Sequence, residues 1–207
     1  MHATAEVGHL ETSTGLDHRK LLMWLFLASE CLFFGGLIAT HLLYRNRSLT
    51  PPCPVDTTLN GAPCPGVFDI PFTSISAFVL LMSSAAMVLA LAAIQRGDIR
   101  GTQIWLLATA MLGMSFLAGQ AFEFTEFYRS GLTLSSNLFG TTFFVLTGFH
   151  GAHVSVGVLI LLSLYAMAGQ GSLRREQSLN VELAGLYWHF VDIVWIVIFT
   201  VVYLIQT

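Results

Sequence analysis

Two apolar stretches in the carboxyl-terminal third of the chain carry ionisable side chains at helical spacing. His150 and His153 lie three positions apart, and His189 and Asp192 repeat that spacing in the next stretch. A spacing of three brings two side chains to one side of a helix. Imidazole and carboxylate groups can bind metals, carry protons or form buried hydrogen bonds, and they cost free energy in hydrocarbon. The pattern therefore predicts a polar interior that several helices share.

Further polar side chains lie in the other apolar segments. A helical rise of about 1.5 Å per residue converts sequence position into depth. On that scale four groups lie at similar depth, slightly inside the midplane: Glu30, His150, His189 and Asp192. Glu123 lies nearer the outer end of its segment, with Gln120 one turn earlier on the same face.

Three interpretations of these side chains compete. His150 and His189 could face each other and ligate a haem. Glu30, His150 and Asp192 could form a proton or ion pathway, although no inverted repeat or broken helix accompanies them. The third interpretation is a hydrogen-bonded network, from glutamate to histidine and from histidine to aspartate, that holds the helices together. Residue chemistry favours the network, and we assign no catalytic residue and no metal ligand.

The composition excludes an ordinary soluble domain. Charged residues make up 10% of the chain and hydrophobic residues 55%, whereas soluble proteins contain about 25% charged residues. The net charge of −3 gives no reason to expect a nucleic-acid partner. Residues 1–20 are polar and are expected to form a short cytoplasmic lead.

Five apolar segments are long enough to cross about 30 Å of hydrocarbon as helices. They do not alternate apolar and polar residues at every second position, as a transmembrane strand would. The sequence therefore predicts an all-α polytopic membrane protein with five transmembrane helices in one bundle, at residues 21–44, 70–95, 102–128, 138–168 and 181–206.

Basic residues predict the orientation of this bundle. An amino terminus in the cytoplasm places six of them inside, at Arg19, Lys20, Arg96, Arg100, Arg174 and Arg175. Three then lie outside, at Arg45, Arg47 and Arg129. Because cytoplasmic loops are enriched in lysine and arginine, this distribution favours a cytoplasmic amino terminus and an external carboxyl terminus.

The external loop at residues 45–69 contains five of the six prolines and two of the three cysteines. A disulfide between Cys53 and Cys64 is plausible in an oxidising compartment, and two unpaired thiols remain the alternative. A structural metal is less favoured because no further histidine or cysteine lies nearby. Cys31, inside the first segment, is expected to be a small buried residue.

Four motifs together resemble subunit III of the haem–copper terminal oxidases. They are LASECLFFGGLIATHLLY at 27–44, GQAFEF at 119–124, TGFHGAHV at 147–154 and YWHFVDIVW at 187–195. The resemblance covers all five predicted spans. Longer members of that family have two additional helices, which this chain lacks.

The resemblance implies a non-redox accessory subunit of a proton-pumping oxidase in a bacterial cytoplasmic membrane. Haem and copper would lie in partner subunits I and II, and this chain would bind none. It would stabilise subunit I, support proton uptake and hold phospholipids. Glu30 occupies the position of a carboxyl group that reacts with carbodiimides in this family, which implies a readily protonated carboxyl.

The resemblance also implies which surface meets a partner and which donor feeds the complex. Small residues permit close helix contact, and those expected to pack against subunit I are Gly35, Gly36, Ala86 and Ala90. Tyr187 and the TGFHG form favour cytochrome c as electron donor to the complex. The alternatives are subunit III of a quinol oxidase, a homologue associated with nitric oxide reductase and, remotely, an autonomous ion transporter.

Overall fold

Five long helices make up most of the molecule. The computed structural model describes residues 17–45, 53, 57–59, 62–64, 66 and 68–205. The helices are α1 (His18–Tyr44), α2 (Ile70–Gln95), α3 (Ile99–Arg129), α4 (Leu138–Gly169) and α5 (Ser178–Phe199). Each is long and apolar enough to cross a membrane, which confirms the predicted all-α membrane fold. Residues 1–16 of the expected amino-terminal lead lie outside the described residues. Helix α1 begins at His18.

Polar residues mark where four of these helices begin. The side chains of Asp17, Asp69, Asp98 and Asn137 each accept a hydrogen bond from a backbone N–H in the first turn of the helix that follows. Such caps satisfy N–H groups that have no partner within the helix. In a chain with few charged residues, the aspartates thus help to define the helix boundaries.

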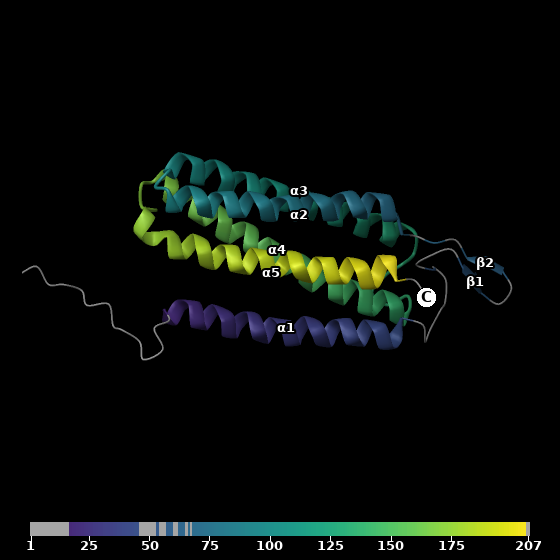
Figure 1. The fold of residues 1–207 in the computed structure, drawn as a ribbon. Helices are drawn as coiled ribbons and strands as arrows, with labels where there is room; N and C mark the ends of the chain where they lie inside the picture. Colours follow the sequence, from purple (N-terminus) through teal and green to yellow (C-terminus); the bar gives the residue numbers. More distant parts are fainter. Residues whose placement is uncertain are drawn as a thin grey trace, which may run out of the picture.

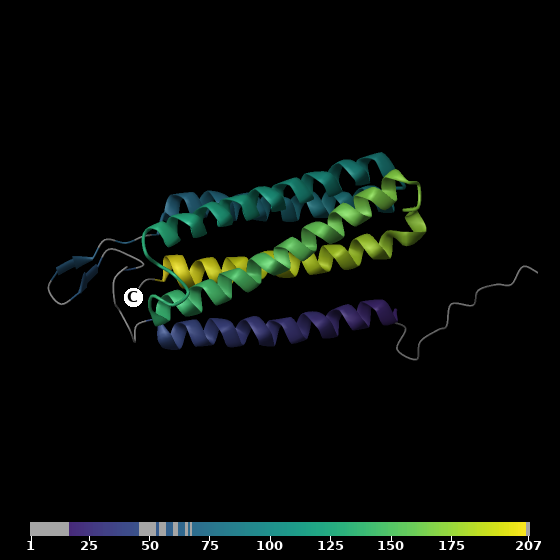
Figure 2. The same cartoon turned by 180° about the vertical axis from the view of Figure 1, so that it is seen from behind.

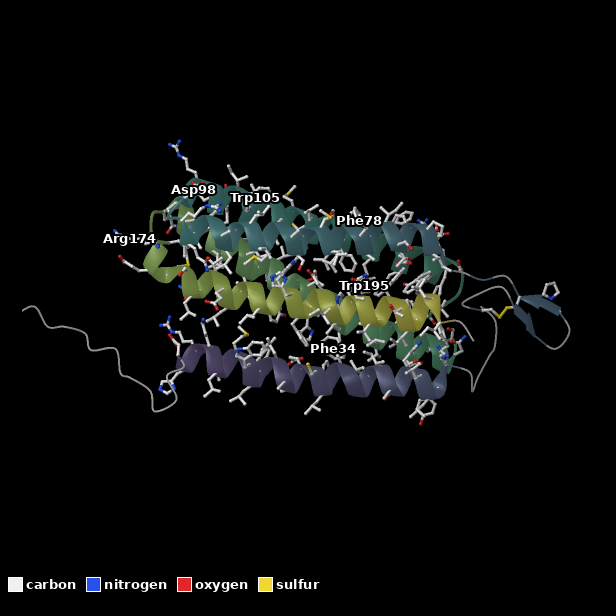
Figure 3. The ribbon with its side chains drawn as sticks, viewed as in Figure 1. Phe34, Phe78, Asp98, Trp105, Arg174 and Trp195 are labelled. Atoms are coloured by element: carbon white, nitrogen blue, oxygen red, sulfur yellow. A yellow bond between two sulfur atoms is a disulfide. The ribbon has the colours of Figure 1, made fainter. Side chains whose placement is uncertain are left out.

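Glycines allow the chain to reverse at three helix ends. Gly97, Gly131 and Gly171 follow α2, α3 and α4 with φ values of 79°, 86° and 70°. Side chains strongly disfavour this left-handed conformation, and glycine adopts it freely. Short connections can therefore follow α2 and α4, and Figure 3 shows Asp98 and Arg174 of those connections at the same end of the bundle.

The helices are arranged with α4 and α5 in the middle. In Figure 1, α2 and α3 run side by side on one side of α5, and α1 lies on the other side. The reverse view in Figure 2 shows the same order, with α1 below α4 and α5. Contacts between elements agree, because α1 packs against α4 and α5 while α2 packs against α3 and α5. Helix α1 is therefore attached to the bundle along only one side.

Irregular turns flank α5. A 3-10 turn, η1 (Arg175–Gln177), precedes it, and a π-helical turn, η2 (Thr200–Leu204), continues it. Tyr203 of η2 is buried. The π turn thus lies where the last helix brings a polar aromatic side chain into the interior of the bundle.

Two short strands lie in the loop at 45–69, where no regular structure was predicted. Strand β1 (Thr57–Leu59) pairs antiparallel with β2 (Ala62–Cys64). A disulfide joins Cys53 to Cys64, which fastens the hairpin to the preceding chain. Figure 1 shows the hairpin beyond the end of the helices. Positions 46–52, 54–56, 60–61, 65 and 67 of this loop lie outside the described residues.

Two sequence expectations about burial are wrong. Cys31 is exposed on α1 and is not a core residue. Ala86 and Ala90 are 6% and 0% exposed, because α2 turns them toward the other helices of the chain. These two alanines therefore cannot contact a partner subunit. Gly35 and Gly36, in contrast, are exposed on α1.

Candidate functional site

A cavity of about 660 Å³ opens between α1, α4 and α5. Most of its wall is apolar. Each of the three helices contributes at least one polar side chain to the lining. It is lined by Met23, Phe26, Glu30, Phe149, Ala152, His153, Val156, Ile160, Leu164, Asn180, Leu183, Ala184 and Tyr187. Asn180 and Met23 lie near the helix ends that carry the predicted cytoplasmic loops, whereas Glu30 lies deeper. The cavity thus runs from that surface toward the middle of the bundle.

A close contact between a histidine and a glutamate lies at the deep end of this cavity. The Nε2 atom of His153 is 3.2 Å from Oε2 of Glu30, which joins α4 to α1. The side chains are 20% and 18% exposed, so both are largely removed from the surroundings yet reach the cavity. Polar groups inside a membrane bundle are stabilised when they pair with each other in this way.

Neighbouring groups fix the orientation of the His153 ring. Its Nδ1 atom lies 2.7 Å from the carbonyl oxygen of Phe149, one turn earlier on α4. The edge of the imidazole meets the ring of Phe34, with centroids 5.0 Å apart, and Figure 3 shows Phe34 directed from α1 toward α5. Tyr187 of α5 donates a hydrogen bond of 3.0 Å to the carbonyl oxygen of His153. Three helices therefore meet at this residue.

Polar contacts also attach α1 at both of its ends. Lys20 forms a 2.7 Å ion pair with Glu182 of α5 at one end. At the other end, Nδ1 of the fully buried His41 lies 3.0 Å from the hydroxyl of Thr142 on α4. Arg45 donates a 2.7 Å hydrogen bond to the carbonyl oxygen of Ile205, after the last helical turn. With the Glu30–His153 pair, these contacts hold α1 along its whole length.

The second predicted histidine of α4 has different surroundings. His150 is fully buried, and its Nε2 donates to the carbonyl oxygen of Val191 on α5 over 3.3 Å. Its ring packs against Phe116 and Trp195, with centroids 5.8 and 4.9 Å away. Figure 3 shows Trp195 inside the bundle. His150 thus connects α3, α4 and α5 and does not reach the cavity.

The expected hydrogen bond between histidine and aspartate is not formed. Asp192 is 3% exposed and forms no direct hydrogen bond with His150, whose Nδ1 has no hydrogen-bond partner among the described residues, while the hydroxyl of Ser84 lies beside the Asp192 carboxyl. The structure corrects the expected continuous network, because the ring of His150 uses its other nitrogen to reach backbone. The glutamate partner is His153 and not His150.

His189 contacts the same Ser84 hydroxyl that lies beside Asp192. Its Nδ1 lies 2.5 Å from the hydroxyl of Ser84 on α2. His150 faces α3 and the backbone of α5. The rings of His150 and His189 therefore do not point toward one shared site. Across residues 17–45 and 68–205 and the short described stretches between them, no three His, Cys, Asp or Glu side chains gather as a metal site. Neither the paired-histidine arrangement nor a pathway through Glu30, His150 and Asp192 corresponds to this geometry.

Gln120 and Glu123 lie in the interior of the bundle, as their spacing on one helix face predicts. Gln120 donates a 2.9 Å hydrogen bond to the carbonyl oxygen of Thr147 on α4. Glu123 accepts hydrogen bonds from Thr73 of α2 and, over 3.3 Å, from Tyr203 of η2. These groups join helix pairs inside the bundle and do not line the cavity.

Several partners were not predicted from the sequence. They are hydroxyl or backbone groups on other helices, such as Ser84, Thr73, Tyr203 and Thr142. A hydroxyl in an apolar segment gives little signal, because it can always bond to its own helix backbone. His41 carried a detectable signal, an imidazole within an apolar segment, which the depth argument did not use.

The fold and these interior contacts define a polytopic helical membrane protein. A family model for cytochrome c oxidase subunit III matches residues 4–207. The chain belongs to this family, subunit III of the haem–copper oxidases.

Relatives from both branches of these oxidases resemble the chain. Cytochrome c oxidase subunit 3 of Synechocystis is 40% identical over 91% of this chain and 76% of its own length. Its counterpart in Thermostichus vulcanus is 35% identical over 91% of this chain and 88% of its own. Quinol oxidase subunit 3 of Bacillus subtilis is 34% identical over 87% and 84%. The chain therefore resembles members of complexes with either electron donor.

Proposed function

We propose that this chain is a non-redox accessory subunit of a proton-pumping cytochrome c oxidase. The observation that supports this role is the distribution of its interior imidazoles. Each interior histidine has its own partner on another helix, and no two share one. These histidines are His41, His150, His153 and His189. Side chains used in this way hold helices together, while haem and copper belong to subunits I and II.

Replacing an interior histidine in the assembled oxidase tests this role. His189→Asn keeps a polar group that can reach Ser84, so the subunit should stay bound. Haem absorbance, copper content and initial oxygen consumption should then match those of the wild-type complex. Loss of a haem band or of copper in this variant would show that the chain holds a redox centre.

The electron donor is a separate part of the proposal. Cytochrome c is favoured by the form of the motifs at 147–154 and 187–195, and the quinol oxidase relative supports the second candidate. A purified complex with a-type haem and dinuclear copper that oxidises cytochrome c would support the first candidate. A complex with b- and o-type haems that oxidises quinol would support the second.

We also propose that the exposed face of α1 packs against subunit I. Gly35 and Gly36 lie on this face, and a Cβ atom added at either position would meet nothing within 4 Å in this chain. Small residues let two helix backbones approach closely in a membrane, where van der Waals packing drives association. Gly36→Leu should therefore detach the chain from subunit I without unfolding it.

The cavity between α1, α4 and α5 is proposed to hold an acyl chain of a phospholipid. Its apolar wall suits a hydrocarbon chain, and its opening near Asn180 would leave the lipid head group at the membrane surface. Ala152→Phe should fill the cavity and reduce the lipid that copurifies with the complex, measured by mass spectrometry. Ala118→Phe on α3, which is exposed outside the cavity, is the matched control. Unchanged lipid content in the Ala152 variant would contradict this proposal.

The orientation completes the proposal. The helix ends that carry Arg96, Arg100, Arg174 and Arg175 lie together at one end of the bundle (Figure 1). We place that end in the cytoplasm of a bacterium. A single cysteine introduced at Ser172, in the connection between α4 and α5, should react with a membrane-impermeant maleimide only after the cells are opened. Labelling in intact cells would reverse the orientation.

A further inference from the structure

We propose that a transmembrane helix of another oxidase subunit lies along α5, on the side of α5 between α1 and α2, and forms a hydrogen bond with Nε2 of His189. The inference rests on the proposed function, because it requires an oxidase complex around this chain. It adds a contact surface to the one proposed on α1, and it depends on a ring nitrogen that the chain leaves accessible.

Three consecutive residues of α5 show which way His189 points. Trp188 donates a hydrogen bond to Ser83 of α2, and Phe190 packs against Phe34 of α1 with ring centroids 6.3 Å apart. Successive residues of an α-helix are about 100° apart around its axis. His189 therefore points outward between α1 and α2, which lie on either side of α5 in Figure 1.

The surface around His189 is apolar and uncovered by this chain. Residues three or four apart lie on one side of a helix. On α5, Ile193 lies one turn after His189 and is 60% exposed, and Val197 one turn further on is exposed as well. Leu81 and Val88 are exposed on the adjoining part of α2. Lipid or another helix must therefore cover this surface.

The His189 ring is the polar exception on that surface. Its Nδ1 lies 2.5 Å from the hydroxyl of Ser84, and its Nε2 has no hydrogen-bond partner among the described residues. Nδ1 of His150 and Nε2 of His41 are enclosed by the chain, whereas Nε2 of His189 is not. This nitrogen therefore reaches the uncovered surface and can meet a group from outside the chain.

The depth of His189 makes water and lipid head groups unsuitable partners. Helical rise places it about 16 Å from the first residue of α5, and Ser84 lies near the middle of α2. Both residues are thus near the centre of the hydrocarbon, whichever end of the bundle faces the cytoplasm. Acyl chains offer no hydrogen-bonding group, and an unpaired polar group in hydrocarbon costs free energy. The partner of Nε2 is therefore a group from another protein chain.

The occupant that fits is a membrane-spanning helix with a hydroxyl or amide side chain at this depth. A segment within hydrocarbon must pair its own backbone groups, as a helix does. Hydroxyl and amide groups both donate and accept hydrogen bonds, so either can pair with Nε2 in both tautomers of the ring. Close packing and interhelical hydrogen bonds of this kind hold helices together in a membrane.

Photo-crosslinking in the intact oxidase complex tests the surface. The photoreactive amino acid p-benzoylphenylalanine is placed at position Ile193 in one variant and at Met111, an exposed residue of α3, in the control. We expect the first variant to join a transmembrane peptide of another oxidase subunit, identified by mass spectrometry, and the control to leave that peptide unmodified.

The other outcomes of this experiment contradict the proposal. Products with lipid alone, with a second copy of this chain, or with the same peptide from both positions would overturn it. The accessory role would still stand if the chain copurified with the oxidase in such a result. Absence of the chain from the purified oxidase would instead contradict the proposed function itself.

A matched pair of substitutions tests the hydrogen bond. His189→Asn keeps a group that can reach Ser84 and withdraws the outer nitrogen, whereas Ser84→Ala removes the contact within the chain and leaves Nε2 in place. Detergent should release the His189→Asn subunit roughly two- to tenfold faster than the wild-type subunit, and the Ser84→Ala subunit at nearly the wild-type rate. Equal release of the two variants, or wild-type release of His189→Asn, would show that His189 makes no contact outside this chain.

Discussion

Trp188 of α5 lies directly against Gly113 of α3. A Cβ atom at position 113 would be 2.5 Å from Cη2 of the indole, and one at Gly157 of α4 would be 2.8 Å from Cε3. The indole Nε1 also donates a 2.9 Å hydrogen bond to the hydroxyl of Ser83 on α2. One buried side chain therefore fills the space where three other helices approach α5, and two of them need glycine at the contact.

Enlarging either glycine should loosen the bundle. Gly113→Val places methyl groups within the space of the indole, and overpacking of this kind costs about 1–3 kcal/mol. We expect the subunit to be lost from the purified complex at a lower temperature than the wild-type chain. Gly148→Val is the matched control, because a Cβ there meets nothing within 4 Å. Equal stability of the two variants would show that Trp188 can move aside.

The contact between Glu30 and His153 at the cavity should tolerate an amide better than a methyl group. Glu30→Gln retains a group that can donate to Nε2 of His153, whereas Glu30→Ala leaves that nitrogen without a partner. An unsatisfied buried polar group costs about 1–3 kcal/mol. The alanine variant should lose the subunit more readily and inactivate faster during turnover, as measured by oxygen consumption over time. Equal damage from both substitutions would point to an obligate proton carrier at Glu30.

The β1–β2 hairpin should depend on its disulfide. Alkylation of the denatured chain without reductant, followed by mass spectrometry, should leave Cys53 and Cys64 unmodified and label Cys31, which forms no disulfide. The short closed loop is expected to contribute about 2–3 kcal/mol of local stability. Cys53→Ser should then make the loop more sensitive to protease added from outside. If both thiols are alkylated, the bridge does not form in the membrane.

Exposed and buried small residues should respond differently to the same enlargement. Ala90→Leu on α2 overfills the interior, where this residue is 0% exposed, and should lower the amount of folded chain. Gly36→Leu should leave the chain folded and release it from subunit I, as detected by immunoblotting after purification. A chain that remains bound with Leu at position 36 would exclude this face of α1 from the interface.

Hydrophobic length and composition were enough to predict five membrane-spanning helices. Periodicity alone did not tell which face of a helix meets another helix of the chain, because lipid-facing and interior residues are both apolar. Ala86 and Ala90 illustrate this limit, since a pair of small residues suits contact within the chain as well as contact with a partner. Their burial follows from the arrangement of α2, α3 and α5.

The sequence identified the polar residues of the candidate site, but it predicted only some of the contacts between them. The depth argument placed Glu30, His150, His189 and Asp192 near one level. It could not choose between His150 and His153 as the partner of Glu30, because these side chains lie on the same side of α4. Rotation of α4 about its axis turns His153 toward α1 and His150 toward α3 and α5. That rotation depends on tertiary packing, including the contact between His150 and Trp195.

The one-sided attachment of α1 has a consequence for biogenesis. Its partners, α4 and α5, are the last two helices to be synthesised, while α2 and α3 can pair as soon as both have entered the membrane. Glu30 must therefore wait in the bilayer or at the insertion machinery until His153 arrives. A nascent chain that stops before α4 presents an unmatched carboxyl group within hydrocarbon, which is costly. Completion of α4 thus supplies the carboxyl group of the first helix with its partner.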